Sequence, residues 1–349
     1  MVDQIRLTKW LAASLLAVFV LGVLGCNQAP RESVIGFQGL TMGTSFSMKW
    51  VDTDDSRLAG IRSEAGVLLA KINQQMSTYI DDSELSLLNQ VGTGVKHPVG
   101  AELMQVLLLA QQVSDKTNGA FDVTVGPLVN LWGFGPDGRI THQPEQAAID
   151  RLKEKIGYRF LHLDPAAGTV LKEHDQYVDL SAIAKGYGVD QLAALLEVHG
   201  IQRYLVEIGG ELRIKGLKPG DEPWRLAIEA PQAGERQVQQ VISIQQGAVA
   251  TSGDYRNYFE EGGVRYSHTI DPRTAHPIRH RLASVTVITD NCAEADALAT
   301  ALMVMGEEQG YNFAIEQGLK ALFISKADEG FETRYTPGFD PYLQESIGG

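Results

Sequence analysis

DLSAIAKGYGVD, residues 179–190, marks the point where the hydrophobic pattern of this chain changes from extended to helical. Tyr177 and Val178 form an apolar, strand-like approach, and Leu and Ala recur at helical spacing after the segment. We therefore expect a strand that delivers its end to the start of a helix. Such a junction presents unpaired backbone N–H groups and the positive end of a helix dipole, and Gly186 and Gly188 permit close approach of a ligand.

A ligand at this junction would be anionic, and a phosphate group is the obvious candidate. Asp179 and Ser181 have a second interpretation, because both residue types also serve as ordinary helix caps. The junction alone does not decide between the two interpretations.

A second motif, CAEADALAT at residues 292–300, is expected to lie on a helix. Asp296 and Thr300 stand four residues apart, so a carboxylate and a hydroxyl share one helix face. Hard oxygen ligands of this kind suit Mg²⁺, which takes the rest of its coordination shell from water and substrate phosphates. The alternative is a solvated helix face on which Thr300 bonds back to its own helix.

The N-terminus has the form of a bacterial lipoprotein signal peptide. Arg6 and Lys9 precede an uncharged apolar run, residues 11–25, that is too short for a comfortable membrane span. The run ends in VLGC, residues 23–26, which resembles a lipoprotein cleavage box, although Leu24 is larger than the residue usually found there.

We therefore expect residues 1–25 to be removed as a signal peptide and Cys26 to carry the lipid. Residues 26–35 would form a short tether at the periplasmic face of a membrane. Asn27 replaces the Asp that favours inner-membrane retention, which gives the outer membrane a slight preference. The alternative is an uncleaved N-terminal anchor.

The charge and cysteine content narrow the class of partner. Loss of residues 1–25 removes Asp3, Arg6 and Lys9, a net +1, and takes the formal charge from −13 to −14. An acidic body argues against nucleic acid or anionic lipid as a partner. With Cys26 committed to lipid, Cys292 remains unpaired and is expected to be a small buried thiol.

The remaining chain is predicted to form one α+β catalytic domain, residues 36–349, because strands and helices do not alternate regularly. Gly209-Gly210 between two apolar runs indicates a hairpin. The predicted helices include one around Leu68 and Ile72 and others at 84–89, 101–117, 128–132, 144–155, 292–300 and 307–317. The predicted strands include 36–51, short strands within 159–178, and 224–230, 239–244, 247–251, 264–270, 282–289, 321–325 and 331–335.

Several motifs taken together resemble the ApbE family and span nearly the whole mature chain in the family's order. They are MGT at 42–44, MSTY at 76–79, GAFDVTVGPLVNLWGFG at 119–135, DLSAIAKGYGVD at 179–190, EIGGEL at 207–212, TSGDY at 251–255, SHTIDPRT at 267–274 and ADALAT at 295–300. The resemblance implies a Mg²⁺-dependent FAD:protein FMN transferase, frequently a lipoprotein, with an α+β body and flavin held in a cleft.

Carried over position by position, the resemblance assigns two groups of residues. The FAD contacts are Met42, Tyr79, Ala120, Phe121, Asp122, Asp179, Lys185 and Ile270. The metal ligands are the backbone carbonyl of Ala182 and the side chains of Asp296 and Thr300. Aromatic and thioether side chains suit flavin or adenine rings, although without the family pattern Met42, Tyr79 and Phe121 would be taken as plain core.

The expected reaction is phosphoryl transfer, in which Lys185 helps to hold the developing charge. We take His268 as the candidate base for the acceptor hydroxyl, with Asp271 as its neighbour or as a further carboxylate near the metal. A strand-end histidine without a catalytic role is the alternative. His276 and His280 are four apart, but Pro277 between them argues against a helical zinc-ligand pair.

Two other functions remain open at this stage: an FAD pyrophosphatase that gives FMN and AMP, and a lipoprotein that binds FAD without turnover. The chain lacks a Walker loop and a dinucleotide-binding glycine fingerprint. It also lacks the family's Ser/Thr-rich acceptor motif. We therefore expect the acceptor hydroxyl on another protein, a subunit of a membrane redox complex.

Overall fold

The structure is a computed structural model that describes residues 31–135, 138, 140, 142–232, 237–254 and 258–343. The expected signal peptide, Cys26 and the first residues of the tether lie outside the described residues. The first strand begins at Ser33, so the end of the predicted tether already belongs to the folded body.

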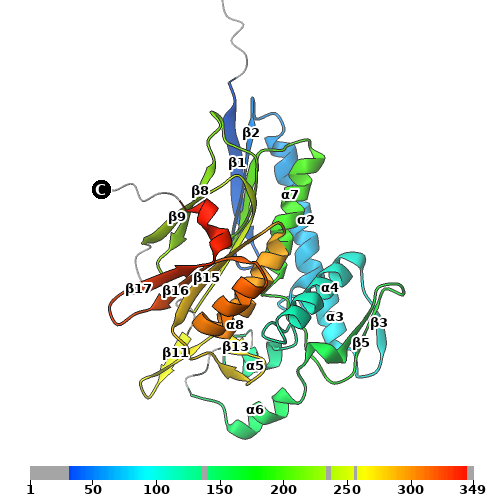
Figure 1. Cartoon of the computed structure of the whole chain (residues 1–349). Coiled ribbons are helices and arrows are strands. Elements are labelled where there is room, and N and C mark those ends of the chain that lie inside the picture. The colour runs from blue at the N-terminus through cyan, green and yellow to red at the C-terminus, as the bar shows by residue number, and fades with distance from the viewer. Residues whose placement is uncertain are drawn as a thin grey trace, which may run out of the picture.

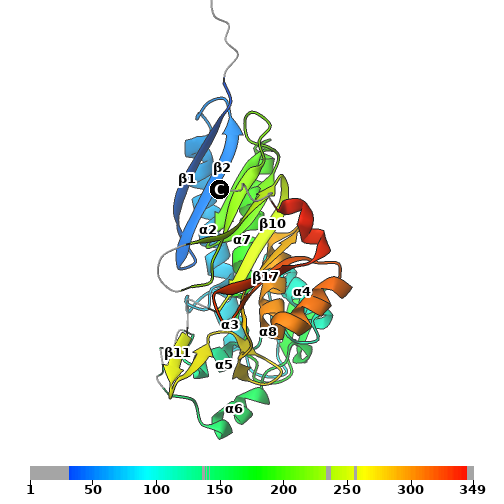
Figure 2. The same ribbon diagram turned by 60° about the vertical axis from the view of Figure 1, so that its left-hand side comes forward.

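A mixed-length antiparallel sheet forms the centre of the molecule (Figures 1 and 2). Among the described residues it has eight strands, in the order β1-β2-β6-β7-β10-β15-β16-β17. Their bounds are Ser33–Thr41, Thr44–Asp52, Tyr204–Ile208, Glu211–Lys215, Gln246–Gly253, Leu282–Thr289, Lys320–Lys326 and Phe331–Tyr335. Strand β15 is buried along nearly its whole length, as expected of a strand covered on both faces.

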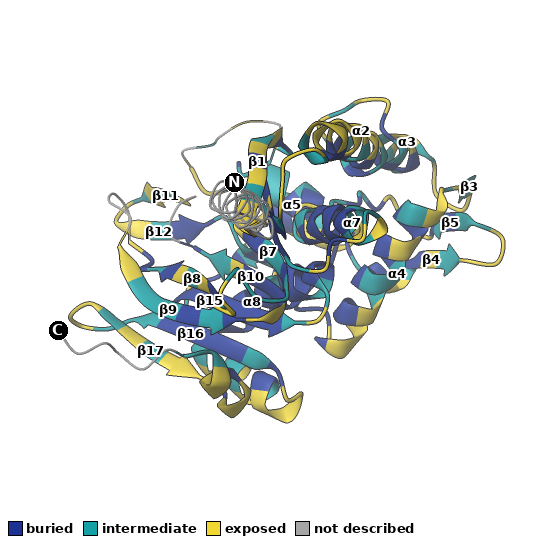
Figure 3. Cartoon of the chain, turned by 90° about the horizontal axis from the view of Figure 1, so that it is seen from above, coloured by how far each residue is buried: buried dark blue, intermediate teal, exposed yellow. Residues whose placement is uncertain are grey.

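Helices cover one face of this sheet (Figure 1). Alternate residues of β6, Tyr204, Val206 and Ile208, pack in the same apolar cluster as residues of α7. The main helices are α2 (Leu58–Met76), α4 (Ala101–Lys116), α7 (Ala184–Val198) and α8 (Cys292–Glu316). Figure 3 shows α7 mostly buried while the outer face of α2 is exposed, so α7 is an interior helix between α2 and the sheet.

The opposite face of the sheet is covered by a hairpin and by the C-terminal segment. Strands β8 (Trp224–Glu229) and β9 (Val238–Ile244) pair with each other and pack with the 3-10 helix η2 (Pro337–Tyr342) in one apolar cluster. The sheet therefore has a core on each face.

The remaining elements form the lower part of the molecule in Figure 1. They are α3 (Glu84–Gln90), β3 (Lys96–Pro98), α5 (Gly126–Leu131), α6 (Gln146–Lys153), η1 (Tyr158–Phe160), β4 (Leu161–Asp164), β5 (Thr169–Lys172), β11 (Tyr258–Glu261), β12 (Val264–Ser267), β13 (Ile270–Asp271) and β14 (His276–Pro277).

The predicted α+β class is confirmed, and so is the hairpin at Gly209-Gly210 between β6 and β7. The two helices predicted at 292–300 and 307–317 are both present within α8, which a kink with non-helical backbone angles at Gly306 (φ 82°) divides in two.

The predicted strand at Tyr177 and Val178 is wrong. This segment has no neighbouring strand, because the side chain of Asn89 takes its place: Asn89 Oδ1 accepts from Val178 N–H at 2.7 Å and Asn89 Nδ2 donates to Val178 O at 2.9 Å. The helix after it begins only at Ala184, following a turn.

Among the described helices, none is long and apolar enough to cross a membrane.

Candidate active site

The site lies where the first turns of α7 and α8 meet, and Gly186 makes the contact possible. A methyl group at Gly186 would collide with the backbone of Cys292 and Ala293. Gly186 N–H donates to Asp296 Oδ2 at 3.1 Å, so a carboxylate of α8 binds the first turn of α7. The two segments singled out in the sequence, more than a hundred residues apart, are therefore in direct contact.

The first turn of α7 offers a phosphate fewer free backbone N–H groups than the sequence suggested. Ala184 N–H donates to Leu180 O at 2.8 Å, and Gly186 N–H is taken by Asp296. Asp179 Oδ1 accepts from Ser181 N–H and from Ser181 Oγ at 2.8 and 2.5 Å, which closes a local turn. Neither Asp179 nor Ser181 caps the helix, whose N-cap residue is Ile183.

A cluster of three charged side chains connects α7, α8 and the start of β7. Lys185 Nζ donates to Glu211 Oε1 at 2.6 Å and lies 3.6 Å from Asp296 Oδ1. The side chains of Glu211 and Asp296 are each 5% exposed, and that of Lys185 is 29% exposed. The second carboxylate oxygen of Glu211, Oε2, is buried and has no hydrogen-bond partner.

Burial and the neighbouring charges shift two of these groups. Burial raises the pKa of Glu211 to about 7, and Lys185 only partly offsets this rise. Burial also disfavours the charged ammonium of Lys185, but the carboxylates of Asp296 and Glu211 outweigh it and raise the pKa of Lys185. Lys185 is therefore a permanent cation at neutral pH.

A cavity of about 450 Å³ opens beside this cluster. The lining has an apolar part, with Phe121, Val125, Phe134 and Ile270 among its residues, and a polar part. The polar residues of the lining include Asp179, Ser181, Lys185, Glu211, Thr251, Ser252, Asp296 and Thr300. An apolar wall beside a cation and carboxylates suits a ligand with a flat ring system and a phosphate group.

Most of the site residues predicted from the sequence line this one cavity. They are Tyr79, Ala120, Phe121, Asp122, Asp179, Ala182, Lys185, His268, Ile270, Asp296 and Thr300. They come from segments spread over more than two hundred residues of sequence, so the fold gathers them. Met42 and Asp271 are the predicted site residues that are not part of this lining.

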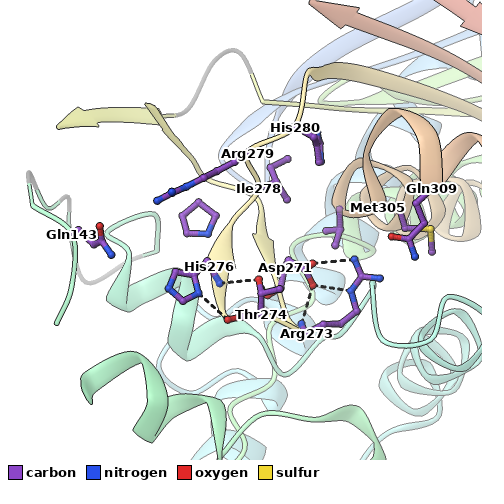
Figure 4. A pocket seen from close by; sticks show the side chains of 12 residues that line it. Gln143, Asp271, Arg273, Thr274, His276, Ile278, Arg279, His280, Met305 and Gln309 are labelled. Carbon is purple, nitrogen blue, oxygen red and sulfur yellow. Dashed lines mark hydrogen bonds and ion pairs between the residues drawn. The ribbon is translucent and has the colours of Figure 1, made fainter. Parts of the chain in front are cut away.

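Asp271 lies at a second cavity of about 660 Å³, formed by the β13–β14 hairpin and α8 (Figure 4). Its carboxylate is held by Arg273, with Nε to Oδ1 at 2.9 Å and Nη2 to Oδ2 at 3.0 Å. This bidentate pair uses both carboxylate oxygens of Asp271, and His268 lines the other cavity. The position of Asp271 therefore does not support the expected partnership with His268.

Met42 occupies the turn between β1 and β2, with a positive φ of 49°. Its methyl group lies 3.2 Å from where a Cβ of Gly188 would be, so Met42 packs on α7. In this structure the side chain serves the core between β1–β2 and α7.

The carboxylate of Asp122 has a structural task in addition to facing the cavity. Oδ1 accepts from Thr124 N–H at 2.8 Å and Thr124 Oγ1 at 2.7 Å, and Oδ2 accepts from Tyr158 N–H at 2.9 Å. Burial raises the pKa of Asp122, although these hydrogen bonds act to lower it.

Tyr79, by contrast, is 71% exposed at the rim, where its ring is free to cover a bound ligand.

His268 lies between β12 and β13 and lines the cavity, with its ring 6.3 Å from that of Phe134 in an edge-on arrangement. The zinc interpretation of His276 and His280 gains no support. His276 is in strand β14, and the Nε2 of His280 is 2.8 Å from Met303 O.

The polar part of the cavity lining fits a hard divalent cation. Asp296 supplies a carboxylate and Thr300 a hydroxyl. Ala182 also lines the cavity, and its backbone carbonyl belongs to the turn before α7. Thr300 Oγ1 lies 3.3 Å from Ser252 Oγ, so it faces the sheet instead of bonding back along its helix. No group of three or more His, Cys, Asp or Glu residues forms a metal cage in the described part of the chain. A Mg²⁺ ion that takes ligands from a phosphate and water needs no such cage.

Sequence reasoning did not single out Glu211 or Ser252, although both belong to quoted motifs. Glu211 follows the Gly209-Gly210 turn and points to the helix side of the sheet, where a carboxylate needs a partner. A charged residue at a strand position expected to be buried was the available signal. The expectation for Cys292 is confirmed: the thiol is fully buried, and burial raises its pKa.

The fold and the cavity define a protein that can hold a ring-bearing phosphate ligand beside a cation. Residues 42–323 match the model of the ApbE family. The chain is 45% identical to the FAD:protein FMN transferase of Vibrio cholerae serotype O1 over 341 residues, which are 97% of this chain and 99% of the relative. It is 39% identical to the FAD:protein FMN transferase of Escherichia coli strain K12, with 92% and 94% of the two chains covered.

Solved structures give the same result. The flavin transferase ApbE from Vibrio cholerae superimposes with a TM-score of 0.82 at 43% identity, covering 89% of this chain and all of that one. The apo flavinyl transferase ApbE of Pseudomonas stutzeri gives 0.83 at 38% identity, covering 91% and 99%. The chain therefore belongs to the ApbE family.

Proposed function

We propose that this protein transfers FMN from FAD to a Ser or Thr hydroxyl of an acceptor protein, with Mg²⁺ bound by polar residues of the cavity lining. The observation that carries the proposal is the meeting of Lys185, Asp296 and Thr300 with an apolar wall in one cavity. Family membership, with relatives named FAD:protein FMN transferase, supports the same reaction.

In this reaction the acceptor hydroxyl oxygen forms a bond to the FMN-side phosphorus of FAD. The bond from that phosphorus to the bridging oxygen breaks, and AMP leaves with the bridging oxygen. Lys185 offers a fixed positive charge to the diphosphate, and the apolar part of the cavity lining receives a ring of the nucleotide. Asp296, Thr300 and the Ala182 carbonyl would hold Mg²⁺, which neutralises diphosphate charge when bound.

His268 is proposed to accept the proton of the hydroxyl, because it lines the same cavity and a neutral imidazole can act as a base. Asp122 and Asp179 are proposed to orient the nucleotide through the backbone that their carboxylates hold in place. The roles of Met42 and Asp271 would be indirect, through Gly188 and Arg273 respectively.

The function is tested by incubating the purified protein with FAD, Mg²⁺ and candidate acceptor proteins drawn from redox-complex subunits. Flavin fluorescence that stays with the acceptor band in a denaturing gel is the expected result. Free FMN and AMP without a labelled band would identify a pyrophosphatase, and unchanged FAD would identify a binding protein. In the same assay, undiminished transfer by His268→Ala would remove His268 from the mechanism.

We also propose that the protein is anchored through a lipid on Cys26 at the periplasmic face of a membrane, the outer membrane being slightly preferred. The cleavage-box resemblance at residues 23–26 supports this proposal. The acceptor would then be an extracytoplasmic redox subunit. An intact mass that still contains residues 1–25 would contradict the lipid anchor on Cys26 and establish the alternative, an uncleaved N-terminal anchor.

A further inference from the structure

The cluster of Lys185, Glu211 and Asp296 in the cavity lining is unbalanced in charge. It places two carboxylates, Glu211 and Asp296, around one ammonium group, Lys185. The ammonium is not shared equally: its Nζ is 2.6 Å from Glu211 Oε1, a short hydrogen bond, but 3.6 Å from Asp296 Oδ1, beyond hydrogen-bond distance. Lys185 is thus bound to one carboxylate and only near the other.

Asp296 keeps one oxygen uncommitted as a result. Its Oδ2 accepts the Gly186 N–H, which fixes the carboxylate in orientation, while Oδ1 has Lys185 only at the longer distance. If Lys185 moved about one ångström it would form a direct pair with Asp296. An ammonium ion so placed would occupy the space and the charge that a divalent cation requires.

We propose that Glu211 is a positioning residue that holds the Lys185 ammonium off Asp296 and so keeps the Asp296 carboxylate open to a divalent cation. The inference rests on the proposed function for the identity of that cation. It assigns Glu211 no contact with FAD and no place in the coordination shell.

Two other ion pairs between α7 and β7 show why the arrangement is unusual. Arg213 pairs with Asp190 at 2.6 Å and Lys215 pairs with Glu197 at 3.1 Å, so in both the strand supplies the cation and the helix the acid. At the cleft the polarity is reversed, with Lys185 on the helix and Glu211 on the strand. Because of this reversal, the Lys185 ammonium lies next to Asp296 of α8, and the Glu211 carboxylate binds the ammonium from the strand.

The burial of Glu211 supports a positioning role over a role in stability. Its Oε2 is buried without a partner, which is unfavourable for folding, and burial raises the pKa of the carboxyl. A pair that served only stability would use both carboxylate oxygens, as Asp190 does with Arg213 and two backbone N–H groups.

The test is a double-mutant cycle on Mg²⁺ affinity, measured by calorimetry on the full-length protein without FAD. Glu211→Gln keeps the shape but removes the charge that retains Lys185, so Mg²⁺ binding should weaken about tenfold. Lys185→Met removes the competing cation, so Mg²⁺ binding should tighten. In the Lys185→Met background, Glu211→Gln should change Mg²⁺ affinity by about threefold or less, because no lysine is left to move.

Glu197→Gln is the matched control, since it removes the acid from the neighbouring α7–β7 pair outside the cavity, and it should leave Mg²⁺ affinity unchanged. An equal loss of Mg²⁺ affinity from Glu211→Gln in both backgrounds would overturn the proposal, since Glu211 would then act on the cation directly. Unchanged affinity in Glu211→Gln, or no Mg²⁺ binding by the wild type, would also overturn it.

The double-mutant cycle measures Mg²⁺ affinity, so its result does not depend on whether the protein transfers FMN. A wild-type protein that shows the coupling but labels no acceptor would contradict the proposed function and leave the role of Glu211 intact. A protein that labels its acceptor without the coupling would do the reverse. Thermal unfolding of each variant checks the fold, and Glu211→Gln should lower the melting temperature only slightly, because Lys185 can then pair with Asp296 and is not left without a carboxylate.

Discussion

Asp190 and Asp296 are two buried aspartates built into the same helix crossing, and they differ in what their second oxygen meets. Asp190 of α7 accepts from the N–H groups of Cys292 and Ala293, each at 3.0 Å, at the start of α8. Asp296 of α8 accepts from Gly186 N–H at 3.1 Å, in the first turn of α7. Each helix thus supplies an acid to the beginning of the other.

The difference lies in the surroundings. Both carboxylate oxygens of Asp190 accept hydrogen bonds, Oδ1 from Arg213 at 2.6 Å and from Cys292 N–H, and Oδ2 from Ala293 N–H. Asp296 faces the cavity, and its nearest cation is held by a different carboxylate. A buried acid with all its oxygens used stabilises a fold, and one left incomplete beside a cavity marks a binding site.

The largest effect is expected from Asp296→Asn. The amide preserves the size of the side chain but is a poor ligand for a hard cation, so FMN transfer should fall about a thousandfold. Thermal unfolding should change little, since Asn can still accept from Gly186 N–H. The rate of acceptor labelling checks the first expectation. A variant that labels at the wild-type rate would place the cation elsewhere.

A smaller effect, on stability, is expected from Asp190→Ala. The change leaves Arg213 and two N–H groups of α8 without their acceptor, which should reduce the free energy of unfolding by about 3 kcal/mol. Urea unfolding measures it. Stability within about 0.5 kcal/mol of wild type would mean that the two aspartates do not differ in the way described.

The helices and the residues on them were the most predictable part of the molecule. Asp296 and Thr300 share a face because helical spacing is local, and Lys185 follows from the motif at 179–190. The strands after residue 200 were also predicted well, since apolar runs end at glycine turns such as Gly209-Gly210.

Features that depend on distant partners were not predictable. The chain at Val178 is extended without a strand because one amide side chain, Asn89, satisfies its backbone. Asp271 pairs with Arg273, and the sequence pattern does not show which neighbour a carboxylate will pair with. The pairing of Glu211 with Lys185 depends on the contact between β7 and α7, which the sequence pattern does not show.

The most direct test of the account locates the cation itself. Crystals of the protein grown with FAD and Mn²⁺ in place of Mg²⁺ should show anomalous scattering from one ion within about 2.5 Å of the Asp296 carboxylate, on the cavity side and next to Thr300. An ion bound at Asp190, at the second cavity near Asp271, or at no position in the cleft would contradict the account.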